Sequence, residues 1–491
     1  MKKLIALLLA LVMVMAMAAC GAKEPAATEP AATEPAATQP AATQPQIEIE
    51  IEEEKGYKKN EELAATVTEE ITLDLVGAGI FYSEVGWEDL VSGLTKPGDE
   101  VIINRWNELY PNVKLNIVRC GWGDTASVVT ASALDGSLDI ILCGASRTDI
   151  NEDLTPYLEA DPEFRDSLYT AASRRRTENP KEAIPTGITT YTAPVVLWLD
   201  TEKFERFGVE LPDADWTWED LLATCEKLTG TDPVTGEDSY GILMPFAGSN
   251  NVIHNQIFAA YNRGCEIYQY GETIKDSVIN YTSPEAIQSF QDVIDLAKYQ
   301  SPEATEGVAV NKAMDGNNNW AIMGSNTAVN DYFTLKAAGL EDRYIAVNLP
   351  YIDDGEWAGL HMPYFGDENL AIWRGSDQKE WCWEFIKFMM TDEVALQWNV
   401  DRLWYTNSKN ATEALEGVLP AYLVEVIGHA VDTMPEGYNT AMSENYNQNM
   451  FGPMNTTLLT AVDDAINGRK TAEEAAQFVQ AAVDEYMAAL E

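Results

Sequence analysis

The chain has 491 residues, of which 46% are hydrophobic and 23% are charged, so it is long and apolar enough to bury a large core. Its 79 acidic residues outnumber its 32 basic residues, and the formal net charge of −47 excludes a protein that binds the phosphates of nucleic acids. At about 150 residues per domain, this length is typical of roughly two to four domains, and two large lobes fit best.

The first residues have the pattern of an export signal. Two lysines precede an apolar run over residues 4–17, which is too short to span a bilayer, and two alanines supply the small residues that a signal peptidase needs. Residues 17–21, MAACG, resemble the bacterial lipoprotein box, with Met17 where leucine is usual. The resemblance implies a signal peptide over residues 1–19 and a diacylated Cys20 that anchors the protein to the extracytoplasmic face of the bacterial cell membrane. An ordinary secretory signal with an incidental cysteine is the alternative.

Residues 20–69 are predicted to hold the anchored cysteine and a linker. Residues 26–45 read AATEP twice and AATQP twice, and a proline at every fifth position blocks a helix. The apolar content is almost entirely alanine, so this segment is expected to be an extended spacer. The acidic run at residues 48–54 contains interleaved isoleucines and is compatible with a strand, but we interpret it as linker. We therefore expect the folded body to begin near Glu70.

From there, strand and helix patterns alternate along the chain. Three runs alternate apolar and polar residues or are continuously apolar, and each stops at a glycine; they begin at Ile71, Val113 and Asp139. Apolar residues at helical spacing lie between them, over residues 102–109 and 126–134. This strand and helix order predicts an α/β fold with a mostly parallel sheet and helices on both faces.

The C-terminal segment, residues 468–490, is predicted to be a helix. Thr471 and Glu474 form a capping box at its start. The apolar residues recur at helical spacing and predict one buried face, made of Ala475, Phe478, Val479, Ala482, Val483, Tyr486 and Leu490.

Several segments resemble the extracellular solute-binding proteins, family 1, of ABC importers, which are the maltodextrin-type sugar binders. Residues 106–115, WNELYPNVKL, are similar to the opening helix and strand of that family, and residues 139–158 are similar to its DLTPYL stretch. The most specific match spans residues 183–222, which contain IPTG, LWLDTEKF and TWEDLL at the family's spacing. Shorter matches continue to the C-terminus, so the resemblance covers about residues 70–491.

The resemblance implies a two-lobed, type II periplasmic-binding-protein-like fold with the ligand cleft between lobes that are joined by hinge strands. The N-terminal lobe would comprise residues 70–188 and 367–402, and the C-terminal lobe residues 192–362 and 408–491. Crossings between the lobes are expected near residues 187–193, 363–370 and 401–407, where regular patterns break at glycine, proline and aromatic residues.

A sugar offers hydroxyl groups to carboxylates, amides and arginine, and weakly apolar faces to aromatic rings. Such side chains follow the predicted strands of the first lobe, occur in the second lobe and lie at the crossings, and Arg147 is the clearest match to the family. A packing role is the alternative for each aromatic residue taken singly. The predicted ligand-binding residues are Tyr82, Trp87, Trp122, Asp124, Arg147, Tyr191, Phe246, Asn250, Asn326, Tyr364, Trp404 and Phe451.

Signals for catalysis, cofactors and metals are weak. The sequence has no G-x-S-x-G, H-E-x-x-H or P-loop motif, and the acidic turns at residues 232–238 and 353–355 lack the full calcium-loop pattern. Five cysteines remain besides Cys20, and no two of them form a C-x-x-C pair. We expect buried free thiols at Cys120, Cys143, Cys225, Cys265 and Cys382.

We therefore expect a non-catalytic, monomeric receptor without a metal or other cofactor. It would capture a mono- or oligosaccharide and deliver it to the membrane subunits of an ABC permease. A secreted carbohydrate-active hydrolase, a sensory module and a binding protein for another solute are the alternatives.

Overall fold

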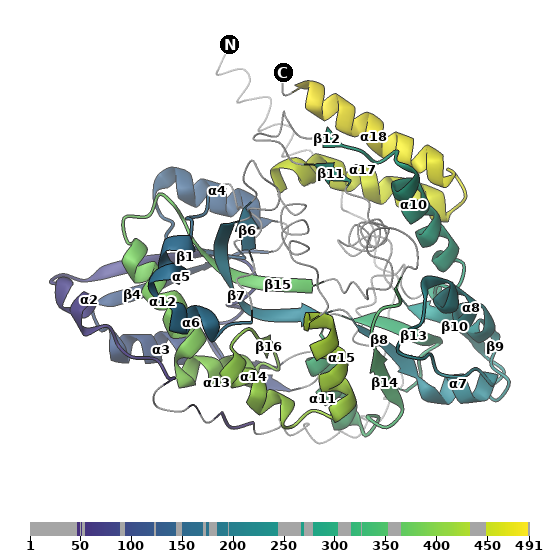
Figure 1. Cartoon of the computed structure of the whole chain (residues 1–491), viewed down its shortest axis with the longest axis horizontal. Coiled ribbons are helices and arrows are strands. Elements are labelled where there is room, and N and C mark those ends of the chain that lie inside the picture. Colours follow the sequence, from purple (N-terminus) through teal and green to yellow (C-terminus); the bar gives the residue numbers. More distant parts are fainter. Residues whose placement is uncertain are drawn as a thin grey trace, which may run out of the picture. The chain divides into compact units, whose positions relative to one another are not determined.

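The protein is represented by a computed structural model, which describes residues 47–49, 51, 55–88, 94–121, 124–143, 150–169, 173–175, 184–194, 196–243, 267–269, 278–302, 316–325, 327–351, 365–432 and 448–489. Two mixed β-sheets, each with helices on both faces, form most of this part of the chain (Figure 1). Within these ranges, no helix combines the length and the hydrophobicity that a membrane crossing needs.

The first sheet contains the three strands that the sequence predicts and three crossing strands. Its order is β16 (Tyr405–Thr406), β7 (Ile184–Pro194), β15 (Phe365–Ile372), β5 (Ile140–Leu142), β1 (Ile71–Gly77) and β4 (Val113–Arg119), with β6 (Ser173–Arg175) paired to β7. β1 runs parallel to β4 and β5, as predicted. The whole sheet is mixed rather than mostly parallel, because β15 runs antiparallel to both β5 and β7, and β16 runs antiparallel to β7.

Helices cover both faces of this sheet. One face packs against α3 (Glu100–Leu109), α5 (Thr155–Ala160), α6 (Pro162–Asp166), α12 (Lys379–Thr391) and α13 (Glu393–Asp401). The other face packs against α4 (Thr125–Asp135), which lies on the opposite side from α3 in Figure 1. Alternation along the strands explains the two cores: Leu73 and Leu75 point to the larger one and Val76 to the smaller one, because successive side chains of a strand face opposite ways.

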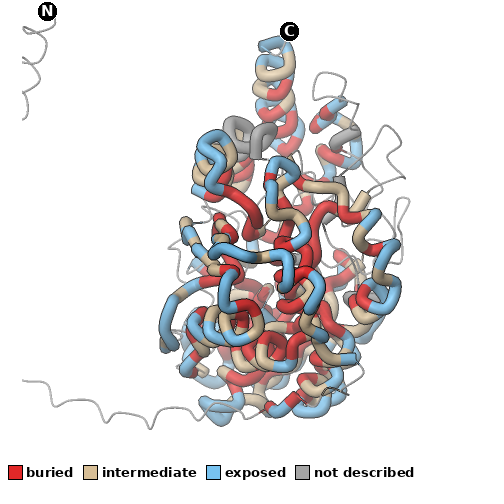
Figure 2. Tube along the Cα trace, turned by 90° about the vertical axis from the view of Figure 1, so that its left-hand side faces the viewer, coloured by how far each residue is buried: buried red, intermediate tan, exposed pale blue. Residues whose placement is uncertain are grey.

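The second sheet has the order β14 (Tyr344–Val347), β8 (Val196–Asp200), β13 (Trp320–Ser325), β10 (Asp238–Leu243) and β9 (Gly230–Thr231). One face packs against α7 (Thr201–Phe207), α8 (Trp218–Leu228), α10 (Pro284–Ala297), α17 (Gln448–Ile466) and α18 (Ala472–Ala489). The other face packs against α11 (Ala328–Ala338), α14 (Lys409–Glu416) and α15 (Ala421–Asp432). Buried residues lie inside these layers, and exposed residues lie on the outside (Figure 2).

The three segments in which the sequence predicts crossings contain β7, β15 and β16, and these strands pair side by side. A single residue separates β7 in the first sheet from β8 in the second. β16 is followed by α14 and α15, which belong to a core of the second sheet. Two short pairs complete the described strands: β2 (Trp87–Glu88) with β3 (Thr95–Lys96), and β11 (Tyr268–Gln269) with β12 (Val278–Ile279).

The folded body begins earlier than the sequence predicts. Residues 47–49, 51 and 55–66, here called the N-terminal strap, lie within the predicted linker, yet they pack on helices of both sheets. The strap contains α2 (Glu61–Thr66), whose Leu63 is buried in the core beside α3 and α12. Tyr57 donates a hydrogen bond from its hydroxyl to the buried carboxylate of Glu384. Its hydroxyl oxygen also lies 2.7 Å from that of Tyr110.

The start of the strap is held by the side-chain amide of Gln397 in α13. The backbone N–H of Ile49 donates to Gln397 Oε1 at 3.0 Å, and Gln397 Nε2 donates to the carbonyl of Ile47 at 2.6 Å. Both isoleucines are buried in a core with α13, α14 and α15. Composition alone did not separate this segment from the linker, because its acidic residues are numerous and its few apolar residues bury only against distant parts of the chain.

The C-terminal helix begins as predicted. Thr471 and Glu474 exchange the two hydrogen bonds of a capping box, at 2.9 and 3.2 Å. Of the predicted buried face, Ala475, Val479 and Val483 are buried and Ala482 and Tyr486 are half-buried, while Leu490 lies outside the described residues. The prediction is wrong at Phe478, which is 40% exposed and lies under the ammonium of Lys470. The core side of α18 is instead formed by Ala472, Ala475, Ala476, Val479 and Val483.

The neighbouring residues Phe478 and Val479 therefore provide a test of this face. We expect Val479→Ala to lower the free energy of unfolding by about 2 kcal/mol, because it removes two fully buried methyl groups. Phe478→Ala, although it deletes more atoms, should change it by less than about 1 kcal/mol, because the ring is exposed. Urea unfolding of the two variants measures both values, and a larger loss for Phe478→Ala would contradict the assigned face.

Candidate functional site

Aromatic rings from five segments of the chain meet where the crossing strands pair. Tyr82 lies in the loop after β1, Trp87 in β2, Tyr191 in β7, Trp398 in α13 and Trp404 just before β16; we call these five residues the aromatic cluster. The ring centroids of Tyr82 lie 6.0 Å from Trp87 and 6.1 Å from Trp404. The cluster thus contains four of the predicted ligand-binding residues, which are far apart in the sequence.

Trp404 is covered on both faces of its ring. The ring of Tyr191 stacks on it with a centroid separation of 4.2 Å and an interplanar angle of 21°. The guanidinium carbon of Arg402 lies 3.9 Å from the Trp404 centroid, and a stacked ring leaves only the opposite face for it. Tyr191 and Trp404 therefore support the wall of the cluster, and this arrangement leaves no open face of Trp404 for stacking on a ligand.

Tyr82 presents an open surface, with 45% of the residue exposed. Its hydroxyl end is enclosed and donates to Glu368 Oε1 in β15 at 3.2 Å. Desolvation and the nearby carboxylate of Glu368 raise the pKa of Tyr82 well above its ordinary value, so the hydroxyl stays protonated and remains a donor. A ring fixed at its hydroxyl end and open on its surface is suited to packing against the apolar face of a sugar.

A buried charged group supports the cluster from inside the protein. Arg402, only 2% exposed, donates from Nη1 to the carbonyl of Ile80 at 2.7 Å, and the same nitrogen lies 3.8 Å from Asp99 Oδ1. Asp99 also accepts a hydrogen bond at 2.7 Å from Nη2 of Arg119. Lys96, itself buried, donates to the carbonyl of Arg402 at 3.2 Å.

The pKa values of this buried group follow from burial and charge. Burial lowers the pKa of Arg402 to about 10, and the carboxylate of Asp99 opposes that shift. Burial raises the pKa of Asp99, opposed by its hydrogen bond from Arg119. At neutral pH, Arg402 remains a cation, and it is enclosed by aromatic faces.

The other predicted ligand residues lie elsewhere or outside the described residues. Asp124 is exposed at the N-cap of α4, the helix that follows β4 in the chain. Phe451 lies in α17, but its side chain is outside the described part. The residues that the structure does not describe are Cys20, Trp122, Arg147, Phe246, Asn250, Asn326 and Tyr364.

Sequence reasoning missed three residues of this region: Glu368, Trp398 and Arg402. A signal for two of them was present, because Trp398 and Arg402 are four residues apart and therefore share one face of a helix. The guanidinium carbon of Arg402 lies 4.2 Å from the ring centroid of Trp398 and 3.9 Å from that of Trp404, so Arg402 contacts both rings of the cluster. Glu368 had no local signal, because its role depends on Tyr82 from a strand loop 286 residues away.

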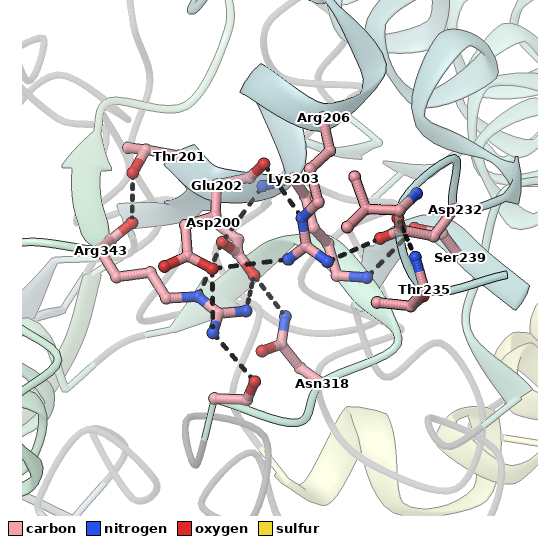
Figure 3. Close-up of polar contacts among 12 residues, drawn as sticks. Asp200, Thr201, Glu202, Lys203, Arg206, Asp232, Thr235, Ser239, Asn318 and Arg343 are labelled. Carbon is pink, nitrogen blue, oxygen red and sulfur yellow. Dashed lines mark hydrogen bonds and ion pairs between the residues drawn. The ribbon is translucent and has the colours of Figure 1, made fainter. Parts of the chain in front are cut away.

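A second buried polar network lies in the other sheet and is structural (Figure 3). Asp200, at the end of β8, is fully buried and accepts two hydrogen bonds from Arg343, at 3.0 and 2.7 Å. It also accepts one from Asn318 at 3.0 Å. The network ties β8, α7 and β14 together and satisfies the buried carboxylate, so we assign it to stability rather than to ligand binding.

A pocket of about 540 Å³ lies between the strap and three helices. It is lined by residues 55–58 of the strap and by residues of α6, α12 and α14 with their flanking positions. Its lysines and carboxylates nearly balance: Lys387 lies 3.8 Å from Asp161 and 3.4 Å from Glu384. None of its lining residues belongs to the aromatic cluster.

The described residues include no group of three or more potential metal-binding side chains. The acidic segment at 232–238 is a turn, as predicted, in which Asp232 accepts the backbone N–H of Val234 at 2.8 Å. Cys225 and Cys382 are buried free thiols as predicted, whereas Cys120 and Cys143 are only half-buried. Cys265 and residues 353–355 lie outside the described part.

Two α/β units joined by adjacent crossing strands, with an aromatic cluster at the crossing, define the class of two-lobed, type II binding proteins. The chain belongs to the bacterial extracellular solute-binding protein family, whose model matches residues 88–396. No curated protein matches the sequence.

Solved structures with the same fold cover most of the chain. The sugar-binding protein MalE from Xanthomonas citri aligns with a TM-score of 0.63 at 14% identity, covering 86% of this chain and 98% of that protein. An ABC transporter solute-binding protein from Agrobacterium radiobacter in complex with ribitol gives a TM-score of 0.61 at 16% identity, with 85% and 99% covered. The ABC substrate-binding protein Lmo0181 from Listeria monocytogenes in complex with cycloalternan gives 0.59 at 19%, with 79% and 95% covered.

Proposed function

We propose that this protein is the substrate-binding lipoprotein of an ABC importer, that it captures a carbohydrate between its two lobes, and that it delivers the ligand unchanged to the permease. The observation that carries the carbohydrate assignment is the exposed ring of Tyr82, fixed by Glu368 beside Trp87 at the crossing strands. Two of the proteins with this fold, from Agrobacterium radiobacter and Listeria monocytogenes, hold ribitol and cycloalternan.

In this proposal Cys20 carries the lipid and residues 21–46 form the tether, which the protein uses to remain at the extracytoplasmic face of the membrane. The receptor is monomeric and its work is binding, not turnover. The sequence motif at residues 17–21 supports the anchor. Replacement of Cys20 by Ala should release the protein from the membrane fraction, and retention of that variant in the membrane would contradict the anchor.

The assignment is tested with the mature chain, residues 20–491, carrying Cys20→Ala so that it is not acylated. Monosaccharides, oligosaccharides, polyols, amino acids and peptides are screened by thermal unfolding, and each hit is checked by calorimetry and by mass spectrometry of the recovered ligand. A ligand at 100 times its dissociation constant adds about 2.7 kcal/mol of stability. A sugar that stabilises the protein and is recovered intact supports the proposal. Stabilisation only by a non-sugar solute would overturn the carbohydrate assignment, and release of cleaved sugar would indicate a hydrolase.

Tyr82→Ala should weaken binding of the sugar found in this screen by about 1 kcal/mol or more, because it removes the exposed ring of the cluster. Phe478→Ala, which removes a similarly exposed ring on α18, is the matched control and should leave the dissociation constant unchanged. Isothermal titration calorimetry measures both. Equal affinities for wild type and Tyr82→Ala would remove Tyr82 from the binding surface.

A further inference from the structure

The backbone around Arg402 has an unusual geometry. The backbone N–H groups of Leu403 and Trp404 donate to the carbonyls of Val400 and Asn399, at 2.8 and 3.3 Å, and this pattern ends α13 in a Schellman motif. The position that favours glycine in that motif is occupied by Leu403, with a φ of 60°. A left-handed conformation is unfavourable for a residue with a side chain, because the Cβ atom then lies too close to the backbone. Other contacts must therefore hold this turn.

Those contacts come from both sides of the turn. Leu403 is 3% exposed in the core shared with α14 and α15, and Lys96 donates to the carbonyl of Arg402 at 3.2 Å. The turn places Arg402 and Trp404 so that the guanidinium lies over the indole ring at 3.9 Å. The left-handed backbone at Leu403 thus holds the side chains of Arg402 and Trp404 in contact.

The guanidinium touches three rings of the aromatic cluster. Its carbon lies 3.9 Å from the centroid of Trp404, 4.2 Å from that of Trp398 and 5.0 Å from that of Tyr82. Among the described residues, its Nε and Nη2 have no hydrogen-bond acceptor, and both atoms are buried. Three aromatic faces lie against the guanidinium, and the carboxylates of Asp99 and Glu368 also stabilise its charge. Arg402 is therefore fixed at Nη1 by Ile80 and Asp99, and the rest of its guanidinium lies against three rings and supports them.

We propose that Arg402 is a positioning residue of the ligand-binding surface: without contacting the ligand, it holds the exposed ring of Tyr82 in place through the aromatic cluster. This inference rests on the proposed function for its binding readout. Tyr82 is fixed at its hydroxyl end by Glu368 and along its ring by Arg402. Loss of the guanidinium removes the second support, and the ring then loses the orientation that a sugar requires.

The structure offers a matched control for this role. Arg119 also binds the Asp99 carboxylate, at 2.7 Å, and does so from a partly exposed position. Arg119→Met therefore removes a cation from Asp99 while all the contacts of Arg402 to the rings stay in place. A comparison of Arg402→Met with Arg119→Met separates the loss of ring support from the loss of charge next to Asp99.

The binding test is a double-mutant cycle with maltotriose as the probe, measured by calorimetry on the mature chain carrying Cys20→Ala. We expect Arg402→Met to weaken maltotriose binding about tenfold, and Arg119→Met to change it by less than about twofold. In the Tyr82→Ala background, Arg402→Met should have almost no further effect, because Arg402 acts through that ring. The same loss of affinity in both backgrounds, or no loss in the first, would overturn the proposal.

Arg402→Lys is a second variant, to be measured if Arg402→Met does not fold. Lysine keeps the positive charge beside Asp99 but has no planar group to lie on three rings, so we expect the same loss of affinity. Wild-type affinity in the lysine variant would overturn the proposal, because charge alone would then be sufficient.

A second measurement does not depend on the ligand. In a crystal structure of unliganded Arg402→Lys, we expect the ring of Tyr82 to have moved and its hydroxyl to have left Glu368. A ring still seated 3.2 Å from Glu368 would overturn the proposal whatever maltotriose does. If wild-type protein fails to bind maltotriose, that failure counts against the proposed function for this sugar, and the crystal structure decides the role of Arg402.

Discussion

A chain that begins at Glu70 should be less stable than one that begins at Ala42 by at least about 3 kcal/mol. The shorter chain lacks the N-terminal strap, whose Ile47, Ile49 and Leu63 are buried. Each such side chain contributes roughly 1.5–3 kcal/mol when it is buried, and part of this sum is offset by the entropy of ordering the strap. Loss of Tyr57 also removes a hydrogen-bond partner from the buried carboxylate of Glu384. Urea unfolding of the two chains measures the difference.

The control for this experiment is a chain that begins at Gln46, which removes residues 42–45 of the tether and keeps the strap. Its free energy of unfolding should equal that of the chain from Ala42. Leu63→Ala in the longer chain should reproduce part of the loss, about 2 kcal/mol or more, because Leu63 lies in the core beside α3 and α12. Equal stability of the chains from Ala42 and Glu70 would show that the strap does not contribute to the fold.

Arg343→Met should lower the free energy of unfolding by about 3–5 kcal/mol, because it leaves the carboxylate of Asp200 buried without its cation. Asp200 is fully buried, and the two hydrogen bonds from Arg343 are its charge-neutralising contacts in this network (Figure 3). Asn318 remains as a neutral partner, and a neutral hydrogen bond compensates the buried charge only in part.

The double variant Arg343→Met with Asp200→Asn separates the charge effect from lost packing. It should be more stable than Arg343→Met alone, because the buried group is then uncharged. Arg469→Met, which breaks an exposed pair with Asp463 and Asp464, should change stability by less than about 1 kcal/mol. A loss in Arg343→Met as small as that in Arg469→Met would contradict the role of the buried pair.

Local patterns predicted much of the first sheet and its helices. β1, β4 and β5 and the helices α3 and α4 lie where apolar periodicity and glycine stops placed them, because these features depend on residues a few positions apart. Periodicity failed at Phe478, since an apolar residue at the edge of a helical stripe can lie in solvent as easily as in the core. It also failed for the strap, whose apolar residues are too few and too widely spaced to form a local pattern.

The candidate site was predicted in part. Tyr82, Trp87, Tyr191 and Trp404 do meet, and three of them lie at strand ends or crossings that the sequence marks. Their division into an exposed ring and a covered stack was not predictable, because it depends on the angle between Tyr191 and Trp404 and on the place of Arg402. A sequence shows which residues carry rings, but it does not show which faces of those rings are covered.

By itself, the sequence determined the order of the first strands and helices, the net charge of −47, and the family to which the chain belongs. Each of these follows from composition or from spacing along the chain. The tertiary structure alone decided where the folded body begins, which ring of the cluster is open, and that Arg402 and Glu368 support it. The contacts that decide them, from Tyr82 to Glu368, from Tyr57 to Glu384 and from Ile47 to Gln397, join residues 286 to 350 positions apart. Burial and electrostatic interactions depend on such contacts rather than on neighbours in sequence.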